Sequence, residues 1–397
     1  MIVIKNVRLI NGTGKEVFPK TDILIENGKI LAAGENITIP EGASVIAGEG
    51  LTAIPGLIDM HTHFGGSSTF DRPSCGSRFE TYDYVKAREG FLRWGVTTVR
   101  TCGDQAEDII SFRNDVKAGK IQAPDVVCCG PFIQVRDGHP WGTVYFKDET
   151  IAEKAVVFVD EDAPIEEQVD RIAAMGVDFI KVFYGHVNAL DYPGSAPCMT
   201  EEQLKRVVES AHRNGLKCAC HVDGPTEMLA AAKAGADTIE HMVNAGNVEN
   251  IEYTEELICT LKENGTVVDP TLIATCRAQT PQMKDVCGPA KTGVKKCFEA
   301  GIPLAVGCDS GIPFVPFGES LHDEMKVLVE AGIPAADVLR MATLGNAQTL
   351  GMADSIGSIE EGKNADIVLL RDDPLTDIDA TKSIALVMKK GRIVYHE

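Results

Sequence analysis

Eight short apolar runs recur through the middle of the chain, and stretches with helical spacing separate most of them. The runs are LIDMHTH, GVTTVRTCGD, DVVCCGPFI, DFIKVFYG, LKCACHVDG, DTIEHMV, TVVDPTL and PLAVGCDSG. Between them, IEEQVDRIAAM and TEEQLKRVVESAHRNG carry apolar residues at helical spacing, and Thr200 stands where a helix N-cap is expected. Eight strands that alternate with helices predict an α/β fold, a (β/α)8 TIM barrel.

An open, doubly wound parallel sheet is the alternative architecture. Such a sheet is expected to carry a glycine-rich phosphate turn after its first strand, and the segment HFGGSS that follows the first run does not match GxGxxG. The barrel is therefore the favoured prediction.

The two ends of the chain have a different pattern, with short strands joined by tight turns. DILIENGKILAAGE predicts a hairpin with Asn27-Gly28 at its turn, and Lys390-Gly391 marks a second turn near the other end. Neither end is long enough to bury a good core alone. We therefore predict one small β-sandwich domain built from residues 1–53 and 351–397, with a barrel over 54–350 inserted between them.

Charge and cysteine usage narrow the partners and the compartment. The net charge of −20 argues against binding to nucleic acid or to an anionic membrane surface. No apolar stretch approaches the ~18 residues of a membrane helix, and the first residues lack the pattern of a signal peptide. The twelve cysteines show neither CxxC pairs nor regular disulfide spacing, so we expect reduced thiols and a cytoplasmic location.

A lysine stands in the middle of the fourth apolar run. Phe179, Ile180, Val182 and Phe183 predict a strand that is buried on both faces, with Lys181 inside it. Burying an ammonium is costly, and burial favours the neutral amine. An ordinary explanation is a side chain whose head reaches water at the end of the strand.

Other metal-binding residue types stand at or near the ends of the predicted barrel strands. In a barrel these ends face one mouth, where active sites lie. His61 and His63 are two residues apart, so both point to the same side of a strand. Singly, each such residue has an ordinary structural explanation, but together they predict a metal site. The residues whose joint position carries this prediction are His61, His63, Lys181, His221, His241 and Asp309.

At this point the sequence resembles a known family. IPGLIDMHTH, IEHM and GCDSG are similar to the first-, sixth- and eighth-strand metal motifs of the amidohydrolase superfamily. The segment from Leu328 to Leu370 resembles the closing helix and return strand of these proteins. The resemblance covers nearly the whole chain and lies in the branch of imidazolonepropionases and prolidase-like amidohydrolases.

The resemblance implies a binuclear centre. In such members the fourth-strand lysine is carboxylated by carbon dioxide and bridges two divalent metal ions, which would explain Lys181. One ion would be held by His61, His63 and Asp309, and the other by His221 and His241. Zinc is the first candidate, because imidazole and carboxylate ligands suit it, while manganese and cobalt are alternatives. Asp309 would be the catalytic general base.

The implied reaction is hydrolysis of an amide bond in a small carboxylate-bearing molecule, such as an N-acyl amino acid or a dipeptide. The substrate-binding candidates are His139, Arg136 and Tyr184. Tyr184 is included because Asp223 stands where prolidase-like relatives often carry an oxyanion-stabilising tyrosine.

Three further points stay open in the sequence. Asp59 and His322 are either supporting partners of the ligands or structural residues. The alternative activities are a mononuclear deaminase, a cyclic-amide, imidazolone-type or lactone hydrolase, and a scaffold without catalysis. Relatives commonly assemble, so a homo-oligomer is expected.

Overall fold

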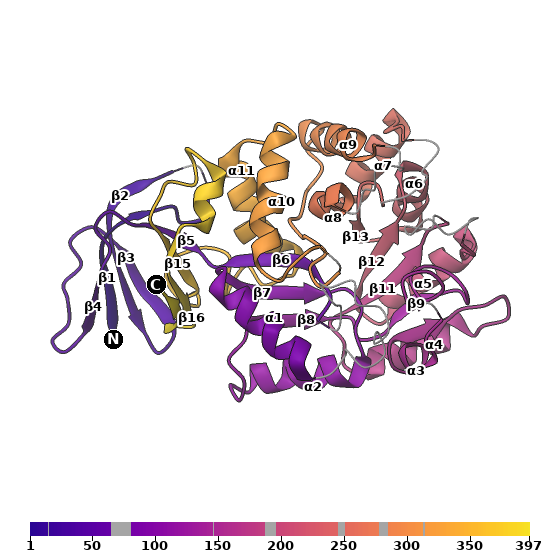
Figure 1. Ribbon diagram of the computed structural model, residues 1–397, viewed down its shortest axis with the longest axis horizontal. Coiled ribbons are helices and arrows are strands. Elements are labelled where there is room, and N and C mark those ends of the chain that lie inside the picture. Colours follow the sequence, from indigo (N-terminus) through magenta and orange to yellow (C-terminus); the bar gives the residue numbers. More distant parts are fainter. Residues whose placement is uncertain are drawn as a thin grey trace.

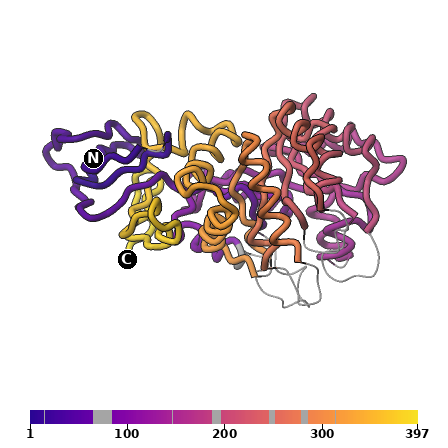
Figure 2. Tube along the Cα trace, turned by 90° about the horizontal axis from the view of Figure 1, so that it is seen from above, coloured from indigo at the N-terminus to yellow at the C-terminus, as the bar shows by residue number. Residues whose placement is uncertain are grey.

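The computed structural model describes residues 1–14, 16–64, 81–145, 147–186, 196–244, 251–277, 285–312 and 314–397. Most of the HFGGSS segment therefore lies outside the described residues. Both ends of the chain lie at one end of an elongated molecule, and the alternating strands and helices form the larger part beside them (Figures 1 and 2).

The two ends of the chain contribute to one mixed sheet. Its order is β17-β16-β15-β5-β1-β2-β3, and β4 pairs with β1. The strands are β1 (Ile2–Leu9), β2 (Phe18–Glu26), β3 (Lys29–Gly34), β4 (Ser44–Ala47), β5 (Thr52–Pro55), β15 (Ile367–Leu370), β16 (Ile384–Lys389) and β17 (Arg392–His396). The joint between the two ends is the antiparallel pair of β5 and β15, in which Thr52 lies opposite Leu370. An apolar cluster with Ile4, Ile23 and Ile367 fills one side of this sheet.

Both predicted turns are confirmed. β2 and β3 pair antiparallel across Asn27-Gly28, and β16 and β17 pair across Lys390-Gly391. Asn27 and Lys390 have φ of 50° and 46°, and each is followed by a glycine with positive φ. Two consecutive positive φ angles match the right-handed twist of the flanking strands, which is why these short turns favour glycine.

The predicted barrel strands form two parallel sheets. β6 (Leu57–Thr62), β7 (Val96–Thr101) and β8 (Asp125–Cys128) make the first, in that order. The second has the order β10-β9-β11-β12-β13-β14. Its strands are β9 (Phe132–Gln134), β10 (Val156–Phe158), β11 (Phe179–Tyr184), β12 (Lys217–Val222), β13 (Thr238–Glu240) and β14 (Val267–Asp269).

The last predicted run, residues 303–311, connects the two sheets. It makes parallel bridges from Leu304 to Val268 of β14 and from Ser310 to Thr62 of β6. The third predicted run divides into β8, which pairs with β7, and β9, which pairs with β11. β10 was not predicted. The parallel strands and their helices give a TIM-barrel-type α/β architecture, in which the strand ends carrying the candidate ligands face the same way.

Helices separate most of the parallel strands and pack around them (Figure 1). They are α1 (Thr81–Arg93), α2 (Ala106–Lys117), α3 (Glu149–Ala155), α4 (Ile165–Ala174), α5 (Glu201–Arg213), α6 (Pro225–Ala234), α7 (Glu255–Asn264), α8 (Leu272–Arg277), α9 (Cys287–Glu299), α10 (Glu319–Glu330), α11 (Ala335–Arg340) and α12 (Asn346–Thr349). A π-helical turn (Met341–Gly345) and a 3-10 helix (Ile378–Lys382) follow α11 and precede β16, respectively. The predicted N-cap is confirmed, because Thr200 and Gln203 form a reciprocal capping box at the start of α5.

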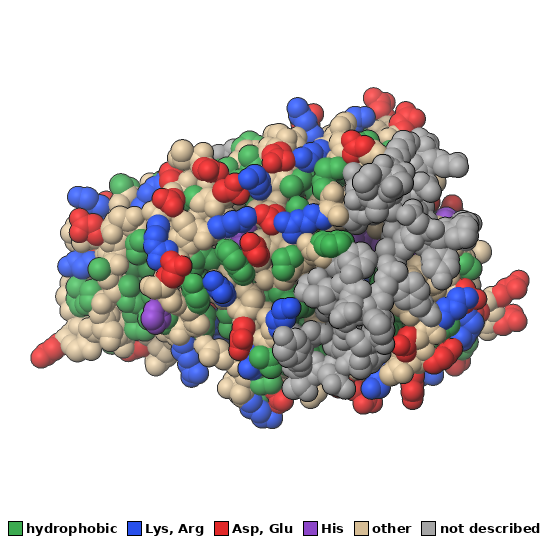
Figure 3. Space-filling model, viewed as in Figure 1, with side chains coloured by type: hydrophobic (Ala, Val, Ile, Leu, Met, Phe, Trp, Pro, Cys, Tyr) green, Lys and Arg blue, Asp and Glu red, His purple; other side chains and the backbone are tan. Residues whose placement is uncertain are grey.

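None of the helices in the described part of the chain combines the length and apolar character needed to cross a bilayer. Acidic and basic side chains are interspersed over the face shown in Figure 3.

One cysteine pair departs from the expectation of reduced thiols. Cys276 at the end of α8 and Cys287 at the start of α9 form a disulfide, with their Cα atoms 5.0 Å apart. The expectation was wrong for this pair because proximity depends on the path between two helices, which a spacing of eleven residues does not reveal. Most of the other described cysteines are buried free thiols.

A buried ion cluster joins the end sheet to the parallel strands. The Lys389 ammonium on β16 lies 2.6 Å from an Asp125 oxygen on β8 and 3.0 Å from an Asp366 oxygen. Lys390 reaches the other Asp125 oxygen at 2.7 Å, but its side chain is 46% exposed, whereas that of Lys389 is 8% exposed. Removing one partner of a buried pair leaves an uncompensated buried charge.

We expect Lys389→Met to lower the free energy of unfolding by about 3–5 kcal/mol, measured by urea denaturation at pH 7. Lys390→Met is the matched control and should cost at most about 1 kcal/mol, because water already solvates that ammonium. Equal losses in the two variants would contradict the assignment of the stabilisation to the buried ion pair.

The pH dependence of this cluster has a definite sign. Burial raises the pKa of Asp125, but the charges of Lys389 and Lys390 outweigh it, so the pKa is lowered. The Asp125 contribution is therefore present above the unfolded-state pKa of about 3.9 and is lost as the pH falls through the lower folded-state value.

Candidate metal centre

Lys181 lies on β11 with no part of its surface exposed. Alternation along the strand puts Phe183 on the same side as Lys181, while Ile180, Val182 and Tyr184 belong to the main apolar cluster on the other side. Among the described residues the Lys181 Nζ atom has no hydrogen-bond partner, and it lies 5.1 Å from the centre of the Phe183 ring. The structure therefore does not show the solvent-reaching head that the ordinary explanation requires.

Three of the other candidate ligands meet at the ends of β6, β13 and the 303–311 segment. Ligand atoms of His61, His241 and Asp309 all lie within 4.8 Å of one another, and all three residues are buried. His63 joins them, because its Nε2 atom lies 3.1 Å from Asp309 Oδ1, compared with 3.6 Å for His61 Nε2. One carboxylate oxygen thus lies between two imidazole nitrogens from the same strand end.

A hydrogen-bonding group holds the Nδ1 atom of each of these histidines. Glu240 Oε2 lies 2.9 Å from His61 Nδ1, and Thr271 Oγ1 lies 2.5 Å from His241 Nδ1. The carbonyl oxygen of Gly103 lies 3.0 Å from His63 Nδ1. Engaging Nδ1 leaves the Nε2 lone pair for another partner, which is the usual arrangement of metal-binding histidines.

His221 lies beside this cluster at the end of β12. Its ring centre is 4.5 Å from that of His241 and 4.8 Å from that of His139. The Asn244 amide nitrogen approaches His221 Nε2 at 3.4 Å, and Asp223 Oδ1 lies 3.5 Å from the same nitrogen. The predicted ligand is therefore close to the cluster, with two polar neighbours at its Nε2 atom.

Burial keeps three of these imidazoles in the form that a metal requires. It lowers the pKa of His61 to about 4, and it also lowers the pKa values of His221 and His241 well below the usual range. Burial alone would raise the pKa of Asp309, but the neighbouring His61 and His63 outweigh it and hold that pKa well below its usual range. Neutral imidazoles and an ionised carboxylate are metal ligands.

Backbone conformation also marks the site. His241 and Asp309 have φ of 75° and 61°, and Thr271, which binds His241, has φ of 43°. Each such left-handed non-glycine residue costs of order 1–3 kcal/mol and persists only where the surroundings hold it, commonly at functional sites. Here the strain turns the side chains just beyond three successive strand ends.

The structure brings one of the three substrate-binding candidates to the cluster. His139 is buried, its Nδ1 lies 2.7 Å from Thr143 Oγ1, and its ring packs on His221. The Arg136 side chain is 54% exposed, lies 3.5 Å from Asp160 and covers the Phe158 ring. Tyr184 lies on the strand side opposite to Lys181.

Asp59 and His322, whose roles the sequence left open, lie in different surroundings. Asp59 accepts hydrogen bonds from the backbone nitrogens of His61 and Cys308, so it ties β6 to the segment that carries Asp309. His322 instead contacts the Trp94 carbonyl and Thr381, away from the ligands. Asp59 is thus a supporting partner, and His322 has a structural role.

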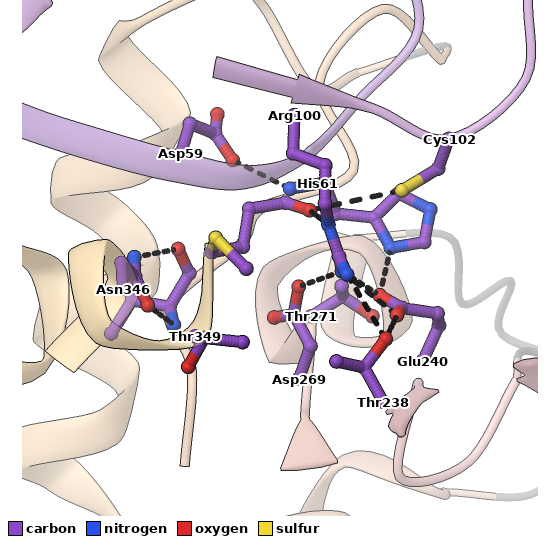
Figure 4. Close-up of polar contacts among 12 residues, drawn as sticks. Asp59, His61, Arg100, Cys102, Thr238, Glu240, Asp269, Thr271, Asn346 and Thr349 are labelled. Atoms are coloured by element: carbon purple, nitrogen blue, oxygen red, sulfur yellow. Dashed lines mark hydrogen bonds and ion pairs between the residues drawn. The ribbon is translucent and has the colours of Figure 1, made fainter. Parts of the chain in front are cut away.

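Sequence reasoning missed a second buried ionic group, which lies next to the proposed ligand His61. Arg100 of β7, Glu240 of β13 and Asp269 of β14 converge there (Figure 4). The available signal was the one that marked Lys181, namely a charged residue inside an apolar strand.

The residues present fit a metal site. The donor set consists of imidazole nitrogens and a carboxylate, with the Lys181 Nζ atom buried nearby and lacking a hydrogen-bond partner among the described residues. Imidazole with carboxylate suits zinc and its neighbours. Fold and site together define a metal-dependent hydrolase of the TIM-barrel type.

Comparisons with known proteins identify the family. The model of the Amidohydrolase family matches residues 52–394. The chain belongs to this family, and it is a metal-dependent amidohydrolase, an enzyme that acts on carbon–nitrogen bonds.

The individual relatives share only a low sequence identity with this chain. An imidazolonepropionase of Caldanaerobacter subterraneus subsp. tengcongensis is 25% identical, over 88% of this chain and 83% of its own. An ochratoxinase of Aspergillus niger is also 25% identical, over 86% and 75%. A solved structure described as a Xaa-Pro dipeptidase with methionine in its active site is 27% identical, covers both chains fully and has a TM-score of 0.83.

Proposed function

We propose that this amidohydrolase cleaves an amide bond in a small carboxylate-bearing molecule, an N-acyl amino acid or a dipeptide, with two divalent ions bridged by carboxylated Lys181. The observation that carries the proposal is the buried Lys181 amine without a hydrogen-bond partner among the described residues, beside a cluster of ligand atoms. The similarity to a Xaa-Pro dipeptidase over the full length supports the dipeptide class.

The proposed ligand assignment follows the two halves of the cluster. His61, His63 and Asp309 would hold one ion, since both imidazoles approach the same Asp309 oxygen. His221 and His241, whose rings lie together, would hold the other. Carbon dioxide would supply the bridge, because a neutral Lys181 amine can attack it, form a C–N bond and release one proton to give an anionic carbamate. Zinc is the first candidate metal.

The chain's own residues would orient the reaction and move its proton. Bound divalent ions supply acidified water and a polarised substrate carbonyl. Asp309 would take the proton of the attacking water and pass it to the leaving amine, for which an ionised carboxylate is suited. His139 would contact the substrate, because it is the one substrate candidate packed against the ligand cluster.

A second candidate is a mononuclear deaminase or a hydrolase of a cyclic amide, imidazolone or lactone. It is favoured by the imidazolonepropionase, which is as similar in sequence as the ochratoxinase. A metal analysis that gave one ion per chain would favour this candidate, and a chain that bound no metal tightly would favour a scaffold without catalysis.

The test is a panel of assays on the metal-loaded enzyme. It comprises N-acyl amino acids, Xaa-Pro and other dipeptides, cyclic amides, lactones and aminated heterocycles. We expect turnover of the first two classes, with loss of activity when the substrate carboxylate is amidated. Turnover confined to heterocycles with release of ammonia would contradict the proposal and identify a deaminase.

On the preferred substrate we expect His139→Ala to raise KM by about 10-fold, as the loss of one buried contact of 1.4 kcal/mol does. Arg136→Ala is the companion variant. Its effect should be smaller, because Asp160 already lies next to the guanidinium and half of the side chain is exposed. A His139→Ala enzyme with unchanged KM would remove His139 from the substrate contacts.

The finer architecture is part of the same proposal. We place a (β/α)8 barrel over residues 54–350 and a β-sandwich domain over 1–53 and 351–397. The closing bridges of the 303–311 segment and the sheet shared by both ends support this division.

A further inference from the structure

A buried ionic group, Arg100 with Glu240, contacts one of the proposed ligands, His61, at its Nδ1 atom. The Arg100 Nη2 atom donates to both Glu240 oxygens, at 2.8 and 2.7 Å, and Nε donates to the Met60 carbonyl at 2.6 Å. Nη1 donates to Thr238 Oγ1 at 3.0 Å. Arg100 is 4% exposed and Glu240 is not exposed at all. The guanidinium therefore connects β6, β7 and β13 through the interior (Figure 4).

Both oxygens of Glu240 are fully engaged. Oε1 accepts from Arg100 and from the Thr238 hydroxyl at 2.6 Å, and Oε2 accepts from Arg100 and faces His61 Nδ1 at 2.9 Å. A carboxylate held by so many donors cannot rotate without breaking several hydrogen bonds. It therefore fixes the orientation of the His61 ring.

The three histidines near Asp309 differ in what supports them. A carboxylate faces Nδ1 of His61, whereas His63 has a backbone carbonyl and His241 a threonine hydroxyl. A carboxylate partner raises the basicity of an imidazole ligand more than a neutral acceptor does. Of the two proposed ions, the one assigned to His61 therefore has a ligand backed by a carboxylate, whereas the one assigned to His241 has a ligand backed by a hydroxyl group.

Glu240 also precedes His241 in the chain. One dipeptide at the end of β13 thus provides the acceptor for a ligand of the first ion and a ligand of the second. Burying this ion pair is costly in itself, since an apolar pair of similar volume is often as stable. A contribution to the metal site would explain why an ionic pair occupies this position.

We propose that Arg100 and Glu240 are a positioning pair that holds His61 for metal binding. Their loss would selectively weaken the binding of the ion held by His61, His63 and Asp309. This inference rests on the ligand assignment proposed above. Arg100 and Glu240 are both buried, and Glu240, held by Arg100, contacts the Nδ1 side of the His61 ring, so the effect is expected in metal affinity before it is expected in chemistry.

The experiment compares metal dissociation constants of full-length variants, measured by chelator competition with zinc and by titration with cobalt while the visible spectrum is recorded. Glu240→Gln keeps an acceptor oxygen but leaves the buried Arg100 guanidinium without the negative charge of its partner. The double variant Arg100→Met/Glu240→Leu removes both charges and leaves His61 Nδ1 without its carboxylate. Asp366→Asn is the control, because it removes a buried, ion-paired carboxylate at Lys389, far along the chain from the ligands.

We expect the double variant to bind one of its two ions about 10–100-fold more weakly and to change the cobalt spectrum, while the other ion keeps its affinity. Asp366→Asn should lose stability and keep both dissociation constants. A folded double variant, with unchanged circular dichroism and both affinities within about threefold of the parent, would overturn the proposal. If the parent itself bound only one ion, the binuclear function would fail, and the affinity of that ion would still test the pair.

Discussion

Replacing Lys181 with alanine is expected to remove the metal pair and reduce activity to background. The parent lysine is fully buried and lies among the ligand-bearing strand ends without a hydrogen-bond partner in the described part of the chain. Without the proposed anionic bridge, no negative charge at this position would offset the repulsion between the two cations. Because the loss affects both ions at once, this is the largest effect that we expect.

The measurement is the metal content per chain, determined on the same samples as the activity. Lys181→Met is the matched variant, since it keeps the apolar stem and cannot be carboxylated. Added bicarbonate or a short carboxylic acid should restore part of the metal and activity in Lys181→Ala, where the space is open, and much less in Lys181→Met. Two tightly bound ions in Lys181→Ala without any additive, or an unmodified Lys181 in a metal-loaded crystal, would contradict the bridge.

Asp309→Asn is expected to lower kcat by about 10²–10⁴-fold while KM changes little. The carboxylate is held ionised by His61 and His63, and its proposed work is to accept and return a proton during the reaction. An amide of the same shape cannot do this. Because Asp309 is also a proposed ligand, a loss of metal would imitate the effect.

The two explanations separate when metal content is brought to the parent level by excess zinc or cobalt. A low kcat at full metal content supports the proton-transfer role. If Asp309→Asn with full metal content turned over at a near-normal rate, Asp309 would not be the base. His322→Asn is a suitable control, since that histidine is buried and bonded to Trp94 and Thr381 instead of the ligands.

The sequence alone predicted most of the fold because the signal for parallel strands is local. Apolar runs and turn pairs such as Asn27-Gly28 depend on neighbouring residues, and these predictions correspond to strands and turns in the structure. The division of the third run into β8 and β9 and the added strand β10 depend on pairing between distant segments. Periodicity carries no information about that pairing.

The site was predictable to the same extent. The strand ends bring His61, His63, His241 and Asp309 together because parallel strands share one mouth. What the sequence did not reveal was the partner of each charge. Arg136 faces Asp160, and Arg100 faces Glu240 from across the interior. Such pairs follow from the path of the chain and not from any motif.

The sheet made from both ends gives the protein an order of assembly. β5 pairs with β15, and about 310 residues separate the two strands. At a synthesis rate of roughly 5–20 residues per second, β5 waits about 15–60 s on the ribosome before its partner emerges. During that time Ala53 and Ile54, fully buried in the finished protein, have no cover on this edge. Until β15 is made, this edge of β5 therefore has no partner strand, and the pairing of β5 with β15 completes the sheet that both ends of the chain share.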